Sequence, residues 1–206
     1  MGLIRGSVSI SRYAVKGDTP PDFWDFVDRR IRANLFLEIE TTTDEQALGW
    51  VSAHDYLDTR FEYASYALDP YVVLGMRVDR RRVPASLLKK YHRLEVRKAL
   101  ALREGRGISR ADREDLKEKV RLDLLGRIPP LTQVFEVCWD THRGEVWLGS
   151  AAKAVREVFE DLFRRTFEVH LWPRIPYLLA GDLLGKGPLA QRLEAAAPLS
   201  LYQPEA

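Results

Sequence analysis

The stretch "LTQVFEVCWDTHRGEVWLGS" (Leu131–Ser150) decides the fold. Two segments rich in Val, Phe and Trp flank the four residues "THRG", which suit a tight reversal of the chain. The stretch therefore predicts a β-hairpin. A helix is expected next, from Ala151 to Thr166, because the apolar residues that follow recur at helical spacing.

Strands are expected at several further places, because apolar and polar residues alternate there. They are Ser7–Val15, Leu35–Glu40, the pair "RFEYASYA" and "YVVLGMRV" joined through "LDP", and the segment "FEVHLW". An amphipathic helix, capped by Asp18 or Thr19, is expected after the first strand. The segment from Thr41 to Asp58 reads as a loop. Strands and helices interleave without a regular βαβ rhythm, so the sequence predicts an α+β fold with an antiparallel-rich sheet.

Residues 84–127 are expected to form a projecting pair of helices, here called the arm. The first helix begins near Pro84 and ends at "EGRG", and the second opens at Ser109 with a capping box to Asp112. We expect residues 1–83 and 128–184 to form one central α+β domain. Residues 185–206, rich in Pro, Ala and Gly, are expected to be a flexible tail.

Charge is concentrated in and next to the arm. The net charge is only +2, yet the segment from Arg77 to Arg127 holds 17 Lys and Arg against 8 Asp and Glu. Such an asymmetry favours a local surface that faces a polyanion. The candidate DNA-binding residues are Arg80, Arg81, Arg82, Lys89, Lys90, Arg93, Arg97, Arg110, Arg113, Lys117 and Arg121.

Helical spacing sorts the arm residues into faces. Lys89, Arg93 and Arg97 share one face of the first helix, and the basic residues of the second helix, from Arg110 to Arg121, also recur at helical spacing. The apolar seams are expected to be Leu87, Tyr91 and Leu94 on the first helix, and Leu116, Val120 and Leu124 on the second.

The basic arm has two interpretations on composition alone. It can bind nucleic acid, or it can be an ordinary solvated surface. Glu114, Asp115 and Glu118 on the second helix favour the solvated alternative, because acidic and basic side chains near one another on a helix are common solubilising charge.

Candidate catalytic residues are sparse. Asp140, His142 and Glu145 form the best carboxylate cluster, but polar residues of this kind are typical of hairpin turns. The four histidines are scattered, and neither a nucleophile elbow nor a phosphate loop is present. The sequence thus predicts no cofactor, no metal and no enzyme activity. Trp50, in the expected loop, is the best candidate for stacking on a base.

Cellular context follows from simple features. The single cysteine, Cys138, excludes an internal disulfide and is expected to be a small buried strand residue. No apolar run approaches the length of a membrane span, and the N-terminus lacks a signal-peptide pattern. We therefore expect a cytoplasmic protein.

Several motifs resemble the RdgC family of bacterial recombination-associated DNA-binding proteins. They are "GWV" (Gly49–Val51), "VPASLLKK" (Val83–Lys90), "DREDLKEKVRLDLLGR" (Asp112–Arg127) and "EVCWDTHRGEVWLGSAAKAVRE" (Glu136–Glu157). The last is the most specific, because "W-D-T-x-x-G" and "S-A-x-K-A" keep their spacing. The resemblance covers about two thirds of the chain.

The resemblance implies a homodimer that encircles duplex DNA without reading its sequence and restrains RecA-driven recombination in the nucleoid. Proteins of the family often carry an exonuclease label, for which neither the family motifs nor this chain supplies a catalytic constellation. We expect a short form that lacks the C-terminal portion that helps to close the ring. Two alternatives stay open: a non-catalytic module whose basic arm binds an acidic protein, and a metal-dependent exonuclease using Asp140 and Glu145.

Overall fold

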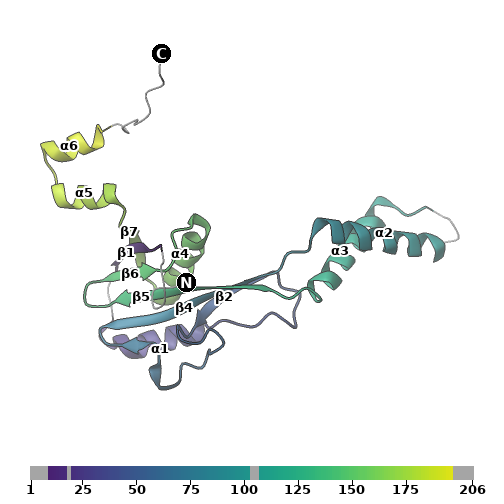
Figure 1. The fold of residues 1–206 in the computed structure, drawn as a ribbon, viewed down its shortest axis with the longest axis horizontal. Helices are drawn as coiled ribbons and strands as arrows, with labels where there is room; N and C mark the ends of the chain where they lie inside the picture. Colours follow the sequence, from purple (N-terminus) through teal and green to yellow (C-terminus); the bar gives the residue numbers. More distant parts are fainter. Residues whose placement is uncertain (1–8, 18–19, 103–106, 197–206) are drawn as a thin grey trace, which may run out of the picture.

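A computed structural model describes residues 9–17, 20–102 and 107–196. It shows an α+β fold, as the sequence predicts. An antiparallel sheet forms the body, the arm projects from one end of it, and a pair of short helices lies at the opposite end (Figure 1).

The sheet has the strand order β2-β4-β5-β6-β1-β7, with the short β3 paired to β4. The strands are β1 (Ser11–Lys16), β2 (Gln46–Val51), β3 (Ala67–Leu68), β4 (Tyr71–Arg80), β5 (Leu131–Asp140), β6 (Glu145–Leu148) and β7 (His170–Pro173). β4 and β5 pair along their whole length, and the β5–β6 hairpin turns between Asp140 and Glu145. The hairpin prediction is confirmed.

One face of the sheet holds the main core and is covered by two helices, α1 (Phe23–Ala33) and α4 (Lys153–Phe167). Val27 and Ile31 of α1 are fully buried, as their four-residue spacing predicts. Trp139 of β5 lies at the centre, with its ring centroid 5.3 Å from those of Phe23 and Phe163. Aromatic packing on this face of the sheet therefore joins both helices to the strands.

β2 occupies the middle of the segment from Thr41 to Asp58 that was expected to be a loop, while residues 41–45 and 52–58 on either side of it are irregular as expected. The strand expected at Leu35–Glu40 is wrong, since only Leu35 makes an isolated bridge, to Trp50. Gly49 allows this arrangement: a Cβ there would lie 2.4 Å from the backbone of Phe36. The "GWV" motif is thus a site of close backbone approach beside a core tryptophan.

Other boundaries also differ from expectation. The first strand of the "LDP" pair is only β3, and Glu62–Ala64 form a 3₁₀ turn before it. Most of the expected first strand lies within β1, while Ser7, Val8 and the expected caps Asp18 and Thr19 fall outside the described residues. After β7 come α5 (Pro176–Leu184) and α6 (Pro188–Glu194). The tail expected from residue 185 onward is therefore helical in α6. Residues 197–206 fall outside the described part of the chain.

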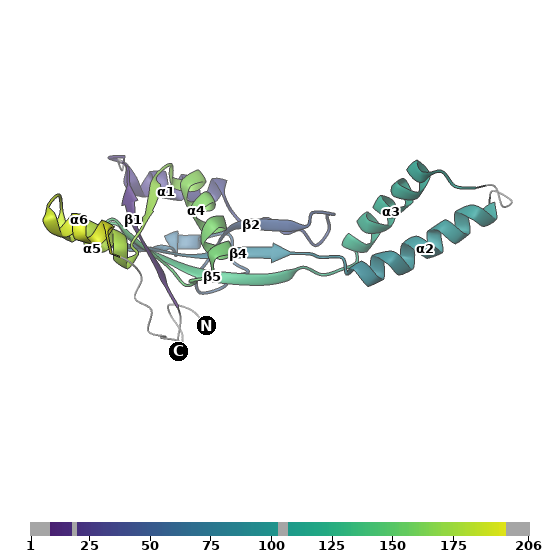
Figure 2. The same cartoon turned by 90° about the horizontal axis from the view of Figure 1, so that it is seen from above.

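The arm consists of α2 (Ala85–Leu102) and α3 (Arg110–Leu125), which extend beyond the ends of β4 and β5 (Figure 2). The capping box of α3 is confirmed: Asp112 N–H donates to the Ser109 hydroxyl at 3.1 Å, and Ser109 N–H donates to the Asp112 carboxylate at 3.3 Å. This satisfies two backbone donors that a helix start otherwise leaves without partners.

The two arm helices pack through a narrow apolar seam. Val120 and Leu124 of α3 are buried, and Leu87 and Tyr91 of α2 are half-buried, as predicted. Leu94 was expected in this seam, but it is 40% exposed. It lies instead among the basic side chains of α2.

Candidate nucleic-acid interface

The exposed basic residues of α2 gather on one face of the helix. Lys89, Arg93 and Arg97 are all exposed, and within the described parts of the chain none of them makes an ion pair. With Ser86, Lys90 and Leu94 they line a hollow of about 440 Å³. We call this surface, formed by Lys89, Lys90, Arg93 and Arg97, the α2 basic face.

The length of this face suits duplex DNA. Eight residues separate Lys89 from Arg97, which corresponds to about 12 Å along a helix axis. That distance is similar to the width of the major groove, about 12 Å. Cations spaced in this way can therefore reach phosphates on either side of a groove.

α3 differs sharply from α2 in its charge. α2 carries five Lys and Arg and one Glu, whereas α3 carries five of each sign. Lys117 pairs with Glu114 at 3.3 Å, and Arg121 pairs with Glu118 at 3.1 Å and with Glu45 of the body.

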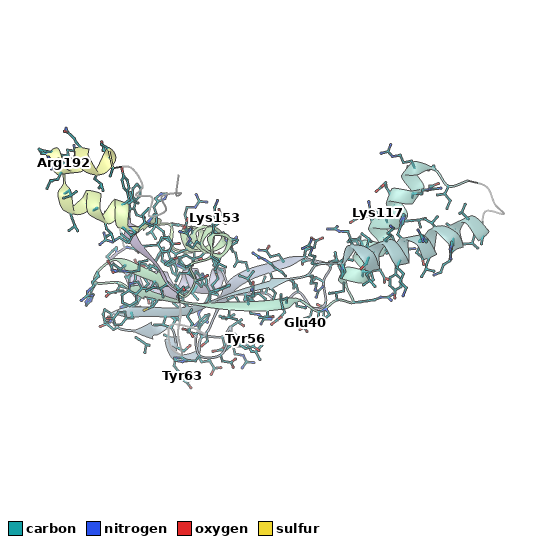
Figure 3. The ribbon with its side chains drawn as sticks, turned by 45° about the horizontal axis from the view of Figure 1, so that its top comes forward. Glu40, Tyr56, Tyr63, Lys117, Lys153 and Arg192 are labelled. Carbon is teal, nitrogen blue, oxygen red and sulfur yellow. The ribbon has the colours of Figure 1, made fainter. Side chains whose placement is uncertain are left out.

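The basic residues predicted on the two arm helices therefore differ in how far neighbouring acidic residues balance their charge. Figure 3 shows Lys117 among the side chains of α3. Arg110 and Arg113 are exposed, and the Arg113 carbonyl contacts His92 Nε2 of α2 at 3.0 Å. Counter-charges on α3 neutralise the positive potential that Lys117 and Arg121 would otherwise provide, which leaves α2 as the dominant cationic helix.

Three consecutive arginines mark the joint between the sheet and the arm, and they do not share one role. Arg80 and Arg82 are exposed, whereas Arg81 is only 5% exposed. The Arg81 guanidinium donates to three backbone carbonyls, those of Ile39 at 2.6 Å, Thr42 at 2.7 Å and Leu125 at 3.1 Å.

Arg81 thereby ties the end of α3 to the segment that precedes β2. Its prediction as a DNA contact is wrong, because its guanidinium is buried and both terminal nitrogens, Nη1 and Nη2, already donate to backbone carbonyls. The sequence carries no signal that separates Arg81 from its two exposed neighbours, since only the tertiary fold decides which of three adjacent arginines is buried.

The carboxylate cluster of the hairpin has a structural explanation. Asp140 is buried, and its Oδ1 accepts the backbone N–H of Arg143 at 2.9 Å, as predicted for an Asp at the start of a turn. Glu145 pairs with Arg12 at 2.9 Å and Arg174 at 3.5 Å. The Arg12 hydrogen bond lowers the pKa of Glu145. Over the ranges the structure describes, no three His, Cys, Asp or Glu side chains are grouped to hold a metal ion.

Trp50, the best candidate for stacking on a base, is fully buried. Its Nε1–H donates to the hydroxyl of Thr166 in α4 at 2.8 Å, and its ring packs against Phe163 and Phe167. Trp50 is buried because it lies in the paired strand β2, not in a loop, and faces the covering helix α4.

Sequence reasoning missed a second buried arginine. Arg77 lies on the sheet face opposite Trp139 and forms double hydrogen bonds with both Asp79 and Glu38. Its guanidinium also lies 4.1 Å from the centroid of Phe36. The strict alternation of β4 could have indicated that Arg77 and Asp79 share a face, but Glu38 comes from a segment with no such signal.

The fold and the arm define a class: an α+β protein that presents a cationic helix beyond the end of an antiparallel sheet. Residues 13–174 match the family model described as "Putative exonuclease, RdgC". The chain belongs to the RdgC family. Membership suggests a recombination-associated DNA-binding role. No helix among the described residues is both long enough and apolar enough to cross a membrane.

Proposed function

We propose that this protein binds duplex DNA through backbone phosphates, without reading the base sequence, and that the α2 basic face is the principal contact. The observation that carries the proposal is the excess of cations on α2, most of them without an ion pair among the described residues, beside an α3 with equal numbers of acidic and basic residues. Phosphate contacts supply most sequence-independent affinity for DNA.

The composition of the arm supports sequence-blind binding. Neither α2 nor α3 contains Asn or Gln, the residues that read adenine with paired hydrogen bonds. The long Lys and Arg side chains of the α2 basic face suit phosphate oxygens, which every sequence presents alike. Family membership further leads us to propose a nucleoid-associated homodimer that restrains a RecA-type recombinase.

The proposal includes no catalytic step. The one carboxylate cluster suggested by the sequence is engaged in turn formation and ion pairs, through Asp140 with Arg143 and Glu145 with Arg12. A two-metal nuclease needs carboxylates that converge on shared ions. The exonuclease wording of the family description therefore finds no support in this hairpin.

The test compares two triple variants with the same change in net charge. The first, Lys89→Gln/Arg93→Gln/Arg97→Gln, removes three of the four cations of the α2 basic face. The matched control, Arg29→Gln/Lys153→Gln/Arg192→Gln, removes three exposed cations from the body and α6. Figure 3 labels two of them, Lys153 and Arg192. Affinity for a labelled random duplex is measured by fluorescence anisotropy, with and without magnesium.

The α2 variant should lose roughly 100-fold in affinity, since each exposed, solvent-screened contact between a cation and a phosphate contributes up to about 1 kcal/mol. The control should lose only the small part that net charge provides. Equal binding by the parent and the α2 variant would contradict the proposal and would favour an acidic protein as the partner of the basic face.

A further inference from the structure

A cavity of about 640 Å³ lies at the joint between the sheet and the arm. Its lining comes from the segments around β2, β4 and β5, where these strands approach the arm. The lining residues are Glu45, Gln46, Arg80, Arg81, Arg82, Ile128, Pro129 and Leu131. A cavity of this volume falls within the range of small-molecule sites, about 300–1,000 Å³.

The strand register gathers hydrogen-bond donors on one side of this cavity. Gln46, Arg80 and Leu131 are direct partners across three adjacent strands, so their side chains lie on the same face of the sheet. Arg82 follows two residues after Arg80 and is also exposed. For Gln46, Arg80 and Arg82 the described residues provide no side-chain hydrogen bond and no ion pair.

Arg81 adds a buried charge for which the described part of the chain supplies no counter-ion. Its guanidinium contacts only carbonyl oxygens, and its Nε is buried without a hydrogen-bond partner among the described residues. Buried cations are normally matched by an anion. The one carboxylate of the lining, Glu45, is already paired with Arg121. The cavity is therefore strongly electropositive, and the field of a buried charge is weakly screened.

The other wall is apolar. Ile128 and Pro129 are part of it, and Leu131, 70% exposed, extends the row formed by Gln46 and Arg80. A surface with cationic donors on one side and aliphatic groups on the other fits a ligand that is anionic at one end and apolar at the other. A nucleotide, with a phosphate and a sugar–base moiety, has this chemistry.

We propose that the joint cavity is a nucleotide-phosphate site, in which Arg80 and Arg82 hold the phosphate oxygens, Gln46 donates a further hydrogen bond and the Ile128–Leu131 wall contacts the sugar or base. The phosphate comes either from the DNA that α2 holds or from a free nucleotide. Only the first source rests on the proposed DNA binding. Planar guanidinium groups suit phosphate in both cases, because each offers two parallel N–H donors.

The experiment uses the full chain and four probes: deoxythymidine monophosphate, thymidine, inorganic phosphate and a random duplex. Calorimetric titration compares the parent with Arg80→Gln/Arg82→Gln. The control is Arg127→Gln, which removes one exposed arginine that lies next to the cavity in the chain and pairs with Asp123. All these changes are on the surface, so thermal unfolding should show the fold unchanged.

A free-nucleotide site predicts that deoxythymidine monophosphate binds the parent more tightly than thymidine or phosphate alone. The double variant should then lose about tenfold or more in that affinity. A DNA source predicts instead a similar loss for the duplex, with little binding of the monophosphate. The control should match the parent on every probe.

The site is refuted if the double variant matches Arg127→Gln on both the monophosphate and the duplex. That result leaves the α2 basic face untouched as a DNA contact. Conversely, failure of the α2 triple variant to weaken duplex binding would refute the proposed function while leaving the monophosphate titration as evidence for the cavity.

Discussion

Replacing Arg81 by Met should destabilise the fold strongly, whereas replacing either of its exposed neighbours, Arg80 and Arg82, should leave the stability of the fold nearly unchanged. Methionine keeps the length of the side chain and removes the three hydrogen bonds to Ile39, Thr42 and Leu125. Hydrogen bonds that involve a charged group contribute about 1.5–3 kcal/mol each. Part of this sum is offset, because the variant no longer buries an unpaired charge.

The net loss should be about 3 kcal/mol in the free energy of unfolding. Urea denaturation followed by tryptophan fluorescence measures it, because Trp50 and Trp139 report on the core. The exposed neighbour provides the control: Arg82→Met should change stability by less than about 0.5 kcal/mol. If Arg81→Met and Arg82→Met unfold at the same urea concentration, the assignment of Arg81 as a structural anchor is wrong.

Three further predictions concern the body. Gly49→Ala should destabilise the protein by more than about 2 kcal/mol in urea unfolding, because its Cβ would overlap the backbone of Phe36; stability like that of the parent would refute this close approach. Glu145, whose pKa is lowered by Arg12, contributes stability above its ordinary pKa of 4.5 that is lost as the pH falls through the folded-state value. Glu145→Gln should therefore make stability less pH-dependent between about pH 7 and pH 3 in urea titrations, and an unchanged dependence would contradict the ion pair. Asp140→Asn should lower stability by about 1 kcal/mol, and the parent should release no nucleotides from DNA with magnesium or manganese; nucleotide release that this substitution abolishes in a folded protein would show a catalytic role.

The sequence predicted those parts of the fold whose signals are local. The hairpin of β5 and β6, the amphipathic spacing of Val27 and Ile31 and the capping box at Ser109 each depend on neighbouring residues. Local preferences and the tertiary structure agree at these places, so the pattern was sufficient.

The missed features depend on contacts between distant segments. The segment "QALGWV" lacks clean alternation, and its strand is fixed by pairing with β4 and by the backbone of Phe36. The burial of Arg81 likewise follows from carbonyls of Ile39 and Leu125, which lie far from it in the chain. No local pattern records such partners.

The candidate interface was predicted in part. The spacing of Lys89, Arg93 and Arg97 correctly placed three exposed cations on one helix face. Acidic residues three positions before Lys117 and Arg121 indicated their neutralisation, but the additional pairing of Arg121 with Glu45 needed the fold.

The salt dependence of duplex binding tests the central claim most directly. The α2 basic face offers three or four phosphate contacts, so the logarithm of the association constant should fall with the logarithm of salt concentration with a slope of about −2.7 to −3.6. Between roughly 50 and 200 mM salt this amounts to a loss of about 100-fold, the same within a few-fold for random and defined duplexes. Binding that is indifferent to salt, or that strongly prefers one sequence, would contradict a phosphate-directed, sequence-blind interface.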